Sequence, residues 1–199
     1  MTLYEKISIL GPGAQYDTCG PKDFGQTTSI PGVYHAKFGS HTCRLFKVLQ
    51  TNHCQNNCRY CAFRRDRPCL RATSTPDEMA SAFDLAHRRR LVDGLFLSSG
   101  IINSPDTTMT AMLDTLSILR QKYHYRGYVH LKIMPGTSAS CISQSFKLAN
   151  RISLNIESPT ETDLAALSPD KDLKNGFFNT LFKIKAQINR QKANNNNPK

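Results

Sequence analysis

The chain has 199 residues with 26 Lys or Arg and 15 Asp or Glu, which gives a formal net charge of +11. Its 39% hydrophobic and 21% charged residues are typical of a folded domain and exclude a wholly disordered chain. No apolar run reaches the roughly 18 residues of a spanning helix, and residues 1–10 lack the apolar centre of a secretory signal. We therefore expect a cytoplasmic protein without a membrane partner. The positive charge fits either an anionic partner such as nucleic acid or a solvated surface that is simply basic.

Residues 1–44 contain many Gly, Pro, Thr and His residues without a sustained period, so we expect an irregular lead-in. The first expected strand, residues 45–49, runs into a cysteine-rich loop over residues 51–71. A helix is expected next, because three adjoining signals mark its start. They are a threonine that can cap, a proline suited to the first turn and a glutamate that completes a capping box. These residues are Thr75, Pro76 and Glu78.

Strands and helices alternate from there onwards. Further strands are expected over residues 95–97, 128–133 and 152–156, and further helices over 106–123, 139–149 and 172–191. A second capping box, from Ser158 to Glu161, predicts one more helix start. One helix carries an apolar stripe that we expect to lie in the core, and its members are Met109, Met112, Leu113, Leu116 and Leu119. The last helix is expected to be amphipathic and carries Phe178, Leu181, Lys185 and Ile188. Residues 192–199 form a polar tail that we expect to be disordered.

This alternation predicts an α/β fold with about four βα units, a parallel sheet and a partial TIM-like barrel, with residues 45–191 as the core domain. Such sheets bind ligands at the carboxyl ends of their strands. The candidate site loops are therefore residues 52–61, 98–100, 134–136 and 155–158.

Seven cysteines without a secretory signal indicate metal or redox chemistry rather than disulfides. Cys54, Cys58 and Cys61 form a C-x3-C-x2-C motif, in which three thiolates within eight residues can bind one centre. Soft sulfur ligands favour an iron–sulfur cluster or zinc. Three ligands from one loop leave a fourth coordination position open, as catalysis requires, whereas structural zinc sites are usually closed.

The alternative is a zinc-stabilised nucleic-acid-binding module without catalysis, which needs a fourth ligand. The candidates for that ligand are Cys43, Cys69, His41 and His53. A second alternative is a degenerate domain that only holds a partner. Small buried or half-buried residues are the simplest interpretation of Cys19, Cys43 and Cys141, and Cys69 is kept outside the metal site.

The cysteine motif, with Tyr60 in the aromatic position before its last cysteine and with a strand before it, resembles the radical S-adenosylmethionine superfamily. Further stretches resemble one bacterial branch of DNA modification or repair proteins that are associated with a uracil-DNA-glycosylase-like partner. These stretches are residues 15–17, 45–61, 95–100, 130–136 and 153–157, and the resemblance covers about residues 1–170.

The resemblance implies an enzyme with a 4Fe–4S cluster on Cys54, Cys58 and Cys61 and S-adenosylmethionine on the open iron. One electron, from a reductant protein such as a flavodoxin or ferredoxin, would cleave the sulfonium to methionine and a 5′-deoxyadenosyl radical. That radical would take a hydrogen atom from a DNA or nucleotide substrate, while the protein orients the cofactors.

The resemblance also assigns cofactor contacts near the cluster. Tyr60 would lean on the adenine or pack over the cluster. Ser98, Ser99 and Gly100 would receive the amino group through carbonyls and hydroxyls, and the alternative for them is a tight turn.

Three further cofactor contacts lie at later strands. Asn155 and Glu157 would bind the ribose hydroxyls, whereas the alternative for Glu157 is a charge at a helix N-terminus. Lys132 would face the cofactor carboxylate, although an exposed lysine is the simpler interpretation.

Five arginines, Arg59, Arg64, Arg65, Arg67 and Arg71, surround the motif. They could bind nucleic-acid phosphates, the cofactor carboxylate or an electron donor. The basic run at residues 87–90 is expected to be a solvated helix face. Proteins of the branch are about twice as long as this chain, and the superfamily core has six strands. We therefore expect an open sheet edge and an incomplete substrate site. A truncated product, a fragment or half of a split protein would have these features.

Overall fold

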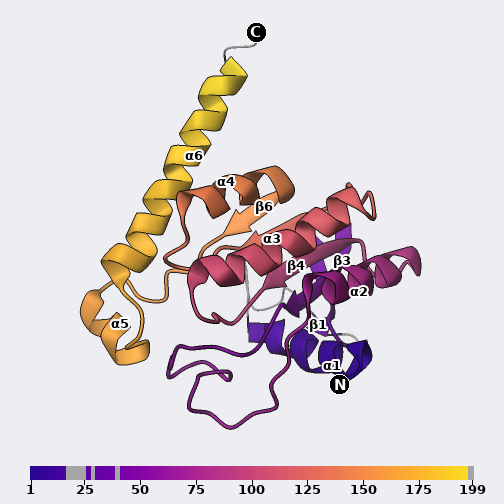
Figure 1. The fold of residues 1–199 in the computed structure, drawn as a ribbon, viewed down its shortest axis with the longest axis horizontal. Coiled ribbons are helices and arrows are strands. Elements are labelled where there is room, and N and C mark those ends of the chain that lie inside the picture. The colour runs from indigo at the N-terminus through magenta and orange to yellow at the C-terminus, as the bar shows by residue number, and fades with distance from the viewer. Residues whose placement is uncertain (17–25, 28–29, 39–40, 197–199) are drawn as a thin grey trace.

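The protein is described by a computed structural model that covers residues 1–16, 26–27, 30–38 and 41–196 (Figure 1). Six strands form one sheet in the order β1 to β6. Strands β3, β4, β5 and β6 are parallel, and β1 and β2 add an antiparallel extension at one side. The bounds are Gln26–Thr27, Val33–Phe38, His41–Leu49, Gly94–Ser98, Val129–Lys132 and Arg151–Ser153. The α/β fold with about four parallel βα units is confirmed, and β6 is the last strand at the other edge of the described sheet.

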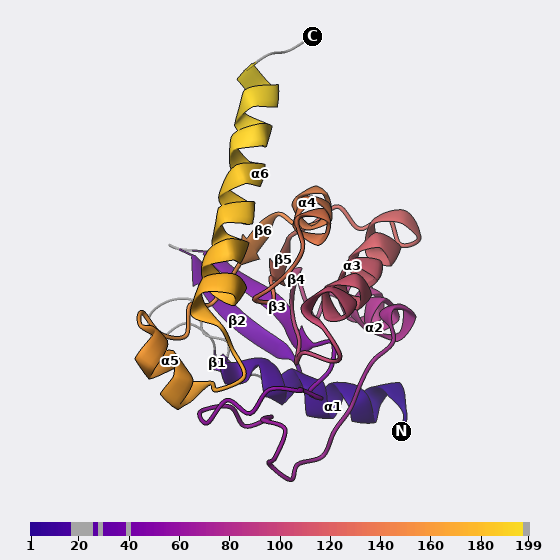
Figure 2. The same cartoon turned by 60° about the vertical axis from the view of Figure 1, so that its left-hand side comes forward.

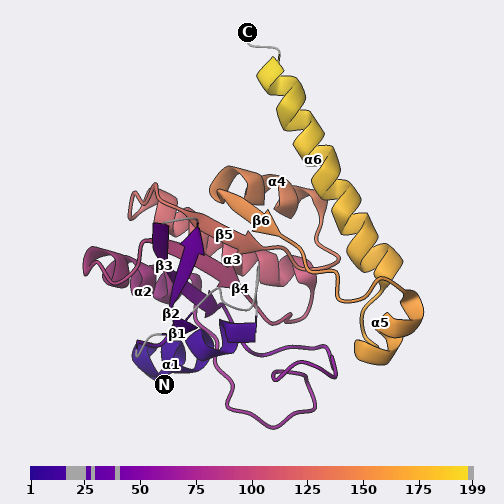
Figure 3. The same cartoon turned by 180° about the vertical axis from the view of Figure 1, so that it is seen from behind.

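Three helices, α2 (Pro76–Arg88), α3 (Pro105–Gln121) and α4 (Ala139–Leu148), cover one face of the sheet (Figures 1 and 3). The predicted capping box at α2 is present, and the predicted core stripe of α3 is buried. These side chains pack against Leu95, Leu97 and Leu131 of the strands in one hydrophobic core. Burial of this apolar stripe supplies the main driving force for docking α3 on the sheet.

The expectation of an irregular lead-in was wrong for the described residues. Helix α1 (Leu3–Gly13) begins with a capping box between Thr2 and Glu5, and its Leu10 is fully buried. Pro12 lies in the last turn, so the hydrogen bond that its missing N–H removes is one of the last in the helix. A short 3₁₀ turn (Ala14–Tyr16) follows, and β2 and β3 form a hairpin ahead of the parallel strands.

The C-terminal part also differs from the expectation. Helix α5 (Glu161–Leu167) is capped by Thr160, whose side chain accepts a hydrogen bond from the N–H of Asp163, and not by Ser158. A π-helical turn, η2 (Leu173–Phe178), then leads into α6 (Asn179–Asn196), so residues 192–196 are helical rather than disordered. Such a wide turn shifts the phase of the helix.

The predicted face of the last helix was wrong by one position, because the residues that pack are Phe177, Thr180 and Ile184. Phe177 and Thr180 are buried, whereas Phe178 and Ile188 are 39% and 38% exposed. Ile184 packs against the main core, and the C-terminal half of α6 extends away from the body (Figure 2). Within the described residues, no helix is both long and apolar enough to span a bilayer.

One carboxylate joins α1 to α2. The Nζ of Lys6 lies 2.7 Å from Oε2 of Glu78, and this same oxygen accepts the N–H of Thr75 at the start of α2. These bonds hold the pKa of Glu78 below its usual range. A carboxyl with a lowered folded pKa stabilises the fold above its unfolded pKa of about 4.3 and loses that effect as the pH falls through the folded pKa.

Glu78→Gln keeps an acceptor for the cap and removes the charge. We expect a loss of about 0.5 kcal/mol in the free energy of unfolding at pH 7, because the ion pair is partly exposed. The difference should shrink towards zero below about pH 3. Urea unfolding of both proteins at the two pH values measures it, and an equal difference at both would contradict the ion-pair explanation.

Candidate metal centre and cofactor cavity

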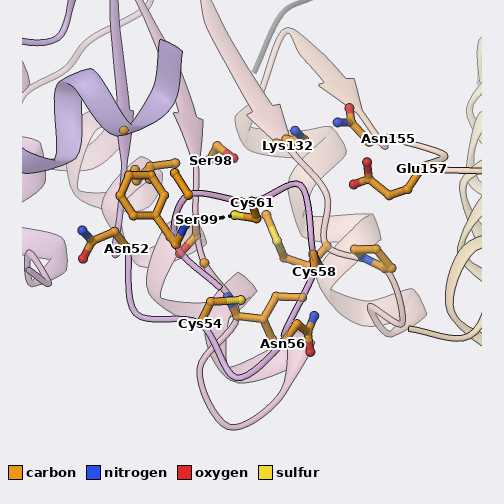
Figure 4. Close-up of a pocket in the computed structure, with 18 of the residues that line it drawn as sticks. Asn52, Cys54, Asn56, Cys58, Cys61, Ser98, Ser99, Lys132, Asn155 and Glu157 are labelled. Atoms are coloured by element: carbon orange, nitrogen blue, oxygen red, sulfur yellow. Dashed lines mark hydrogen bonds between the residues drawn. The ribbon is translucent and has the colours of Figure 1, made fainter. Parts of the chain in front are cut away.

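A cavity of about 470 Å³ opens at the carboxyl ends of the parallel strands. All four candidate loops contribute to it, which agrees with the expectation for a parallel α/β sheet. The ten residues proposed from the sequence line this one cavity, and they are Cys54, Cys58, Tyr60, Cys61, Ser98, Ser99, Gly100, Lys132, Asn155 and Glu157. Figure 4 shows the cysteine loop on one side, with Lys132, Asn155 and Glu157 across from it.

The cysteine loop keeps its shape through two buried or partly buried polar side chains. Asn52 donates to the carbonyl of Leu70 and accepts the N–H of Ala72. Arg71 donates to four carbonyls of the loop, at distances of 2.6 to 3.1 Å. These belong to Asn52, Phe63, Arg64 and Arg67. Arg71 therefore has a structural role in holding the loop, because its donors are directed at backbone carbonyls of the loop.

The three motif cysteines have different surroundings. Cys58 is buried, while Cys54 and Cys61 are half-buried. The Sγ of Cys54 accepts the N–H of Ile101 at 3.5 Å, and the Sγ of Cys61 accepts the N–H of Phe63 at 3.3 Å. Burial raises the pKa of the Cys61 thiol. Backbone N–H groups aimed at sulfur favour thiolates and are one way in which proteins tune iron–sulfur clusters.

No group of three His, Cys, Asp or Glu side chains among the described residues is close enough to hold a single metal ion. A cluster with a separate iron for each thiolate needs its sulfur atoms further apart than a single ion does. The described lining contains none of Cys43, Cys69 and His53, and the side chain of His41 lies outside the described residues, as does Cys19. None of the fourth-ligand candidates from the sequence therefore lies among the described side chains of the cavity.

The turn after β4 approaches the cysteine loop very closely. The N–H of Gly100 donates to the carbonyl of Thr51, and a Cβ at Gly100 would lie 2.1 Å from the carbonyl oxygen of His53. The Oγ of Ser99 is buried and has no hydrogen-bond partner among the described residues. Such an orphaned hydroxyl costs stability unless a ligand satisfies it, so it points to an occupant of the cavity.

The side of the cavity formed by β5 and β6 is charged. Lys132 is half-buried and lines the cavity, so the simpler interpretation as an exposed lysine was wrong. Burial lowers its pKa to about 8, with nearby Glu157 opposing this shift and Lys171 adding to it. Glu157 precedes the first residue of α5 by four positions and faces the cavity, so it is not a charge at the N-terminus of that helix.

Lys171 was missed by the sequence analysis. Its Nζ lies 3.2 Å from Oε1 of Glu157 and 3.2 Å from the hydroxyl of Tyr60. It follows Pro169 and Asp170 in a turn after α5 rather than a strand end, so its sequence position gave no signal.

The remaining loop arginines divide into two groups. Arg64 donates to the carbonyl of Arg59, and Arg65 contacts Asp66 and the carbonyl of Gln55. The exposed guanidinium groups of Arg59 and Arg67 have no hydrogen-bond or ion-pair partner among the described residues, and Arg67 lines the cavity. The basic run at residues 87–90 is exposed, as expected.

No family model and no curated protein matches the sequence. Among solved structures, HydG, a maturase of the FeFe-hydrogenase, is similar with a TM-score of 0.58, 16% identity and coverage of 70% of this chain and 31% of that one. HydG from Carboxydothermus hydrogenoformans matches with a TM-score of 0.58, 20% identity and coverage of 70% and 32%. Methylornithine synthase (PylB) matches with a TM-score of 0.55, 15% identity and coverage of 70% and 40%.

The chain spans between 31% and 40% of the length of these proteins. They are radical S-adenosylmethionine enzymes with partial TIM-like barrels. At 15 to 20% identity the likeness concerns the fold. The chain therefore shares the partial-barrel α/β fold of the portion of these enzymes that it covers.

Proposed function

We propose that the chain is a radical S-adenosylmethionine protein that binds a 4Fe–4S cluster through Cys54, Cys58 and Cys61, with S-adenosylmethionine in the adjoining cavity. The observation that carries this proposal is the convergence of the three cysteines with the ends of β4, β5 and β6 on one cavity. The fold shared with radical S-adenosylmethionine enzymes supports it further.

The donor set fits these groups. Three thiols supply soft ligands and leave one further position for a small ligand. When bound, the cluster supplies one electron for the reductive cleavage of S-adenosylmethionine. The orphaned Ser99 hydroxyl and the polar cavity walls match a cofactor that carries an amino group, a carboxylate and ribose hydroxyls.

The chain's own residues would divide the binding of the cofactor. Lys132 would hold the carboxylate, because an amine with a pKa of about 8 is largely protonated at neutral pH. Glu157 and Asn155 would accept or donate to the ribose hydroxyls. Ser99 would accept from the amino group, and the apolar wall at Ile101 would exclude water from the reacting bond.

Anaerobic reconstitution, with assays of iron, sulfide and zinc, tests this proposal. We expect about four irons and about four sulfides per chain, because each of the three cysteines binds one corner of a four-iron cluster. Stoichiometric zinc without sulfide would contradict the proposal and favour the structural zinc module.

We further propose that the substrate is a nucleic acid or nucleotide. The net charge of +11 supports an anionic substrate, as do the guanidinium groups of Arg59 and Arg67, which have no partner among the described residues. Arg67 lines the cavity, and Arg59 stands in the sequence between Cys58 and Tyr60, which line it. A reductant protein and a uracil-DNA-glycosylase-like partner remain predictions from the sequence resemblance.

The double replacement Arg59→Ala, Arg67→Ala tests the phosphate contacts. For a single-stranded oligonucleotide, the logarithm of the association constant falls linearly with the logarithm of the salt concentration. We expect this slope to become shallower by about 1.4, which is about 0.7 for each lost phosphate contact. Arg89→Ala, Arg90→Ala is a matched control, because these exposed residues follow α2 at the opposite end of the strands. Equal losses in both double variants, or no loss in either, would contradict a phosphate site at the cavity.

A further inference from the structure

Three polar contacts join the cysteine motif to a segment more than a hundred positions later in the chain. The N–H of Asn57 donates to Oδ2 of Asp170 at 2.6 Å, and the N–H of Arg59 donates to the carbonyl of Leu167 at 2.8 Å. The Nζ of Lys171 contacts the Tyr60 hydroxyl at 3.2 Å. The three motif residues stand between Cys54 and Cys61, so each contact acts directly on the spacing of the candidate ligands.

We call residues 167–171 the clasp. Its last residue, Lys171, also contacts other parts of the domain. The Lys171 ammonium, with a side chain only 12% exposed, also contacts Glu157 after β6 and lies over the ring of Phe177. Phe177 belongs to a small buried cluster that contains Leu164 of α5 and also Leu173 of η2.

The segment after the clasp is tied to the end of β5 as well. The N–H of Gly136 donates to the carbonyl of Gly176 and to the Thr180 hydroxyl. The elements that carry the clasp therefore hold the loops that follow β5 and β6, and all three ribbon views place α5 beside the cysteine loop (Figures 1 to 3).

We infer that the clasp is a positioning device that holds the cysteine loop at a fixed place relative to the ends of β5 and β6. Asp170 fixes the backbone of the motif at Asn57, and Lys171 fixes Tyr60 relative to Glu157 across the cavity. Both are positioning residues, since they act through other residues. The inference deepens the proposed function. Its consequence, that the clasp sets the geometry of the cluster and cofactor sites, rests on that proposed function.

The contacts suggest matched variants. Asp170→Ala removes the acceptor for Asn57 and the carboxylate that lies 4.0 Å from Nη1 of Arg65. Asp170→Asn keeps an oxygen for Asn57 and removes only the charge, which at the partly exposed Arg65 pair is worth little. Lys171→Met removes the ammonium and keeps the apolar stem over Phe177, whereas Lys171→Arg retains a cation. Lys174→Met is the control, because Lys174 is an exposed lysine of η2 that has no side-chain partner among the described residues.

The first measurement uses limited trypsin digestion of the full chain without cofactors, so it is independent of the proposed function. We expect Asp170→Ala and Lys171→Met to speed cleavage at residues 59–67 by about tenfold, because hydrogen bonds to charged groups are among the stronger ones. Cleavage at residues 88–90 serves as the internal control and should keep its rate. Asp170→Asn, Lys171→Arg and Lys174→Met should match the wild type.

The second measurement uses the same variants after anaerobic reconstitution. We expect Asp170→Ala and Lys171→Met to keep their helical circular dichroism and to show a changed EPR line shape and weaker binding of S-adenosylmethionine by about tenfold. Unchanged cleavage at residues 59–67 in both variants would overturn the clasp. Faster cleavage in proteins that bind no iron and sulfide would keep the clasp and overturn the proposed function, so the two failures are distinguishable.

Discussion

Cys58→Ala should reduce bound iron and sulfide from about four of each per chain to near zero after anaerobic reconstitution. Cys58 is the middle cysteine of the motif and the most buried of the three, so its loss leaves two half-exposed thiols that cannot hold a cluster against chelators. Iron and sulfide assays, with the visible absorbance of the cluster, measure the effect.

Three control variants separate the cluster from the zinc alternative. Cys43→Ala removes a half-buried cysteine of β3 that does not line the cavity, and it should keep full iron. Cys69→Ser and His53→Ala should also keep full iron, because neither residue lines the cavity. Metal loss in either of these two, or full retention of iron in Cys58→Ala, would contradict the ligand assignment.

Gly100→Ala should destabilise the fold and release the cluster. The added Cβ would lie 2.1 Å from the carbonyl oxygen of His53 and 3.2 Å from the Cβ of Cys54, and a backbone atom cannot move aside as a flexible side chain can. We expect a loss of about 3 kcal/mol in the free energy of unfolding and a fall in Tm of about 9 °C.

Gly176→Ala is the matched control, because a Cβ there meets only the Cβ of Pro135 at 3.8 Å. It should change stability by less than about 0.5 kcal/mol. Thermal unfolding followed by circular dichroism compares the two variants. A Gly100→Ala protein as stable as Gly176→Ala would mean that the turn after β4 and the cysteine loop are not held at this close distance.

The parallel core was predictable because local signals there agree with one another. The capping box at Thr75 and Glu78 begins α2, and the Met and Leu stripe of α3 faces the sheet, as its helical spacing requires. The same patterns predict where the strands end. Because ligands of parallel sheets bind at the carboxyl edge, the strand ends also predict where the site lies. For this reason the four candidate loops could be named from the sequence pattern, whereas the individual cofactor-binding residues were implied by the family resemblance.

The N-terminal helix was missed although its signal was present. Thr2 and Glu5 form a capping box, and Leu3, Ile7 and Leu10 follow at helical spacing. The Gly and Pro residues that end this helix, and the Gly-rich surroundings of the hairpin, outweighed that signal in the sequence analysis. The capping box at Thr2 and the helical spacing of Leu3, Ile7 and Leu10 are together sufficient to predict α1.

The other misses depend on contacts between distant parts of the chain. Arg71 braces the cysteine loop because the loop folds back over it, and its sequence neighbours show only a basic cluster. Lys171 reaches Tyr60 across 111 positions, and a turn after a helix does not predict such a contact. The orientation of Lys132 follows from the pairing of β5 with β6, which its own strand does not specify.

EPR spectroscopy of the dithionite-reduced, reconstituted protein, with and without S-adenosylmethionine, tests the central claim most directly. The cavity beside the three cysteines is expected to place the cofactor on the open iron, so addition of S-adenosylmethionine should shift the g values of the reduced cluster. A cluster signal that does not change with S-adenosylmethionine, or no cluster signal in a zinc-loaded protein, would contradict the account.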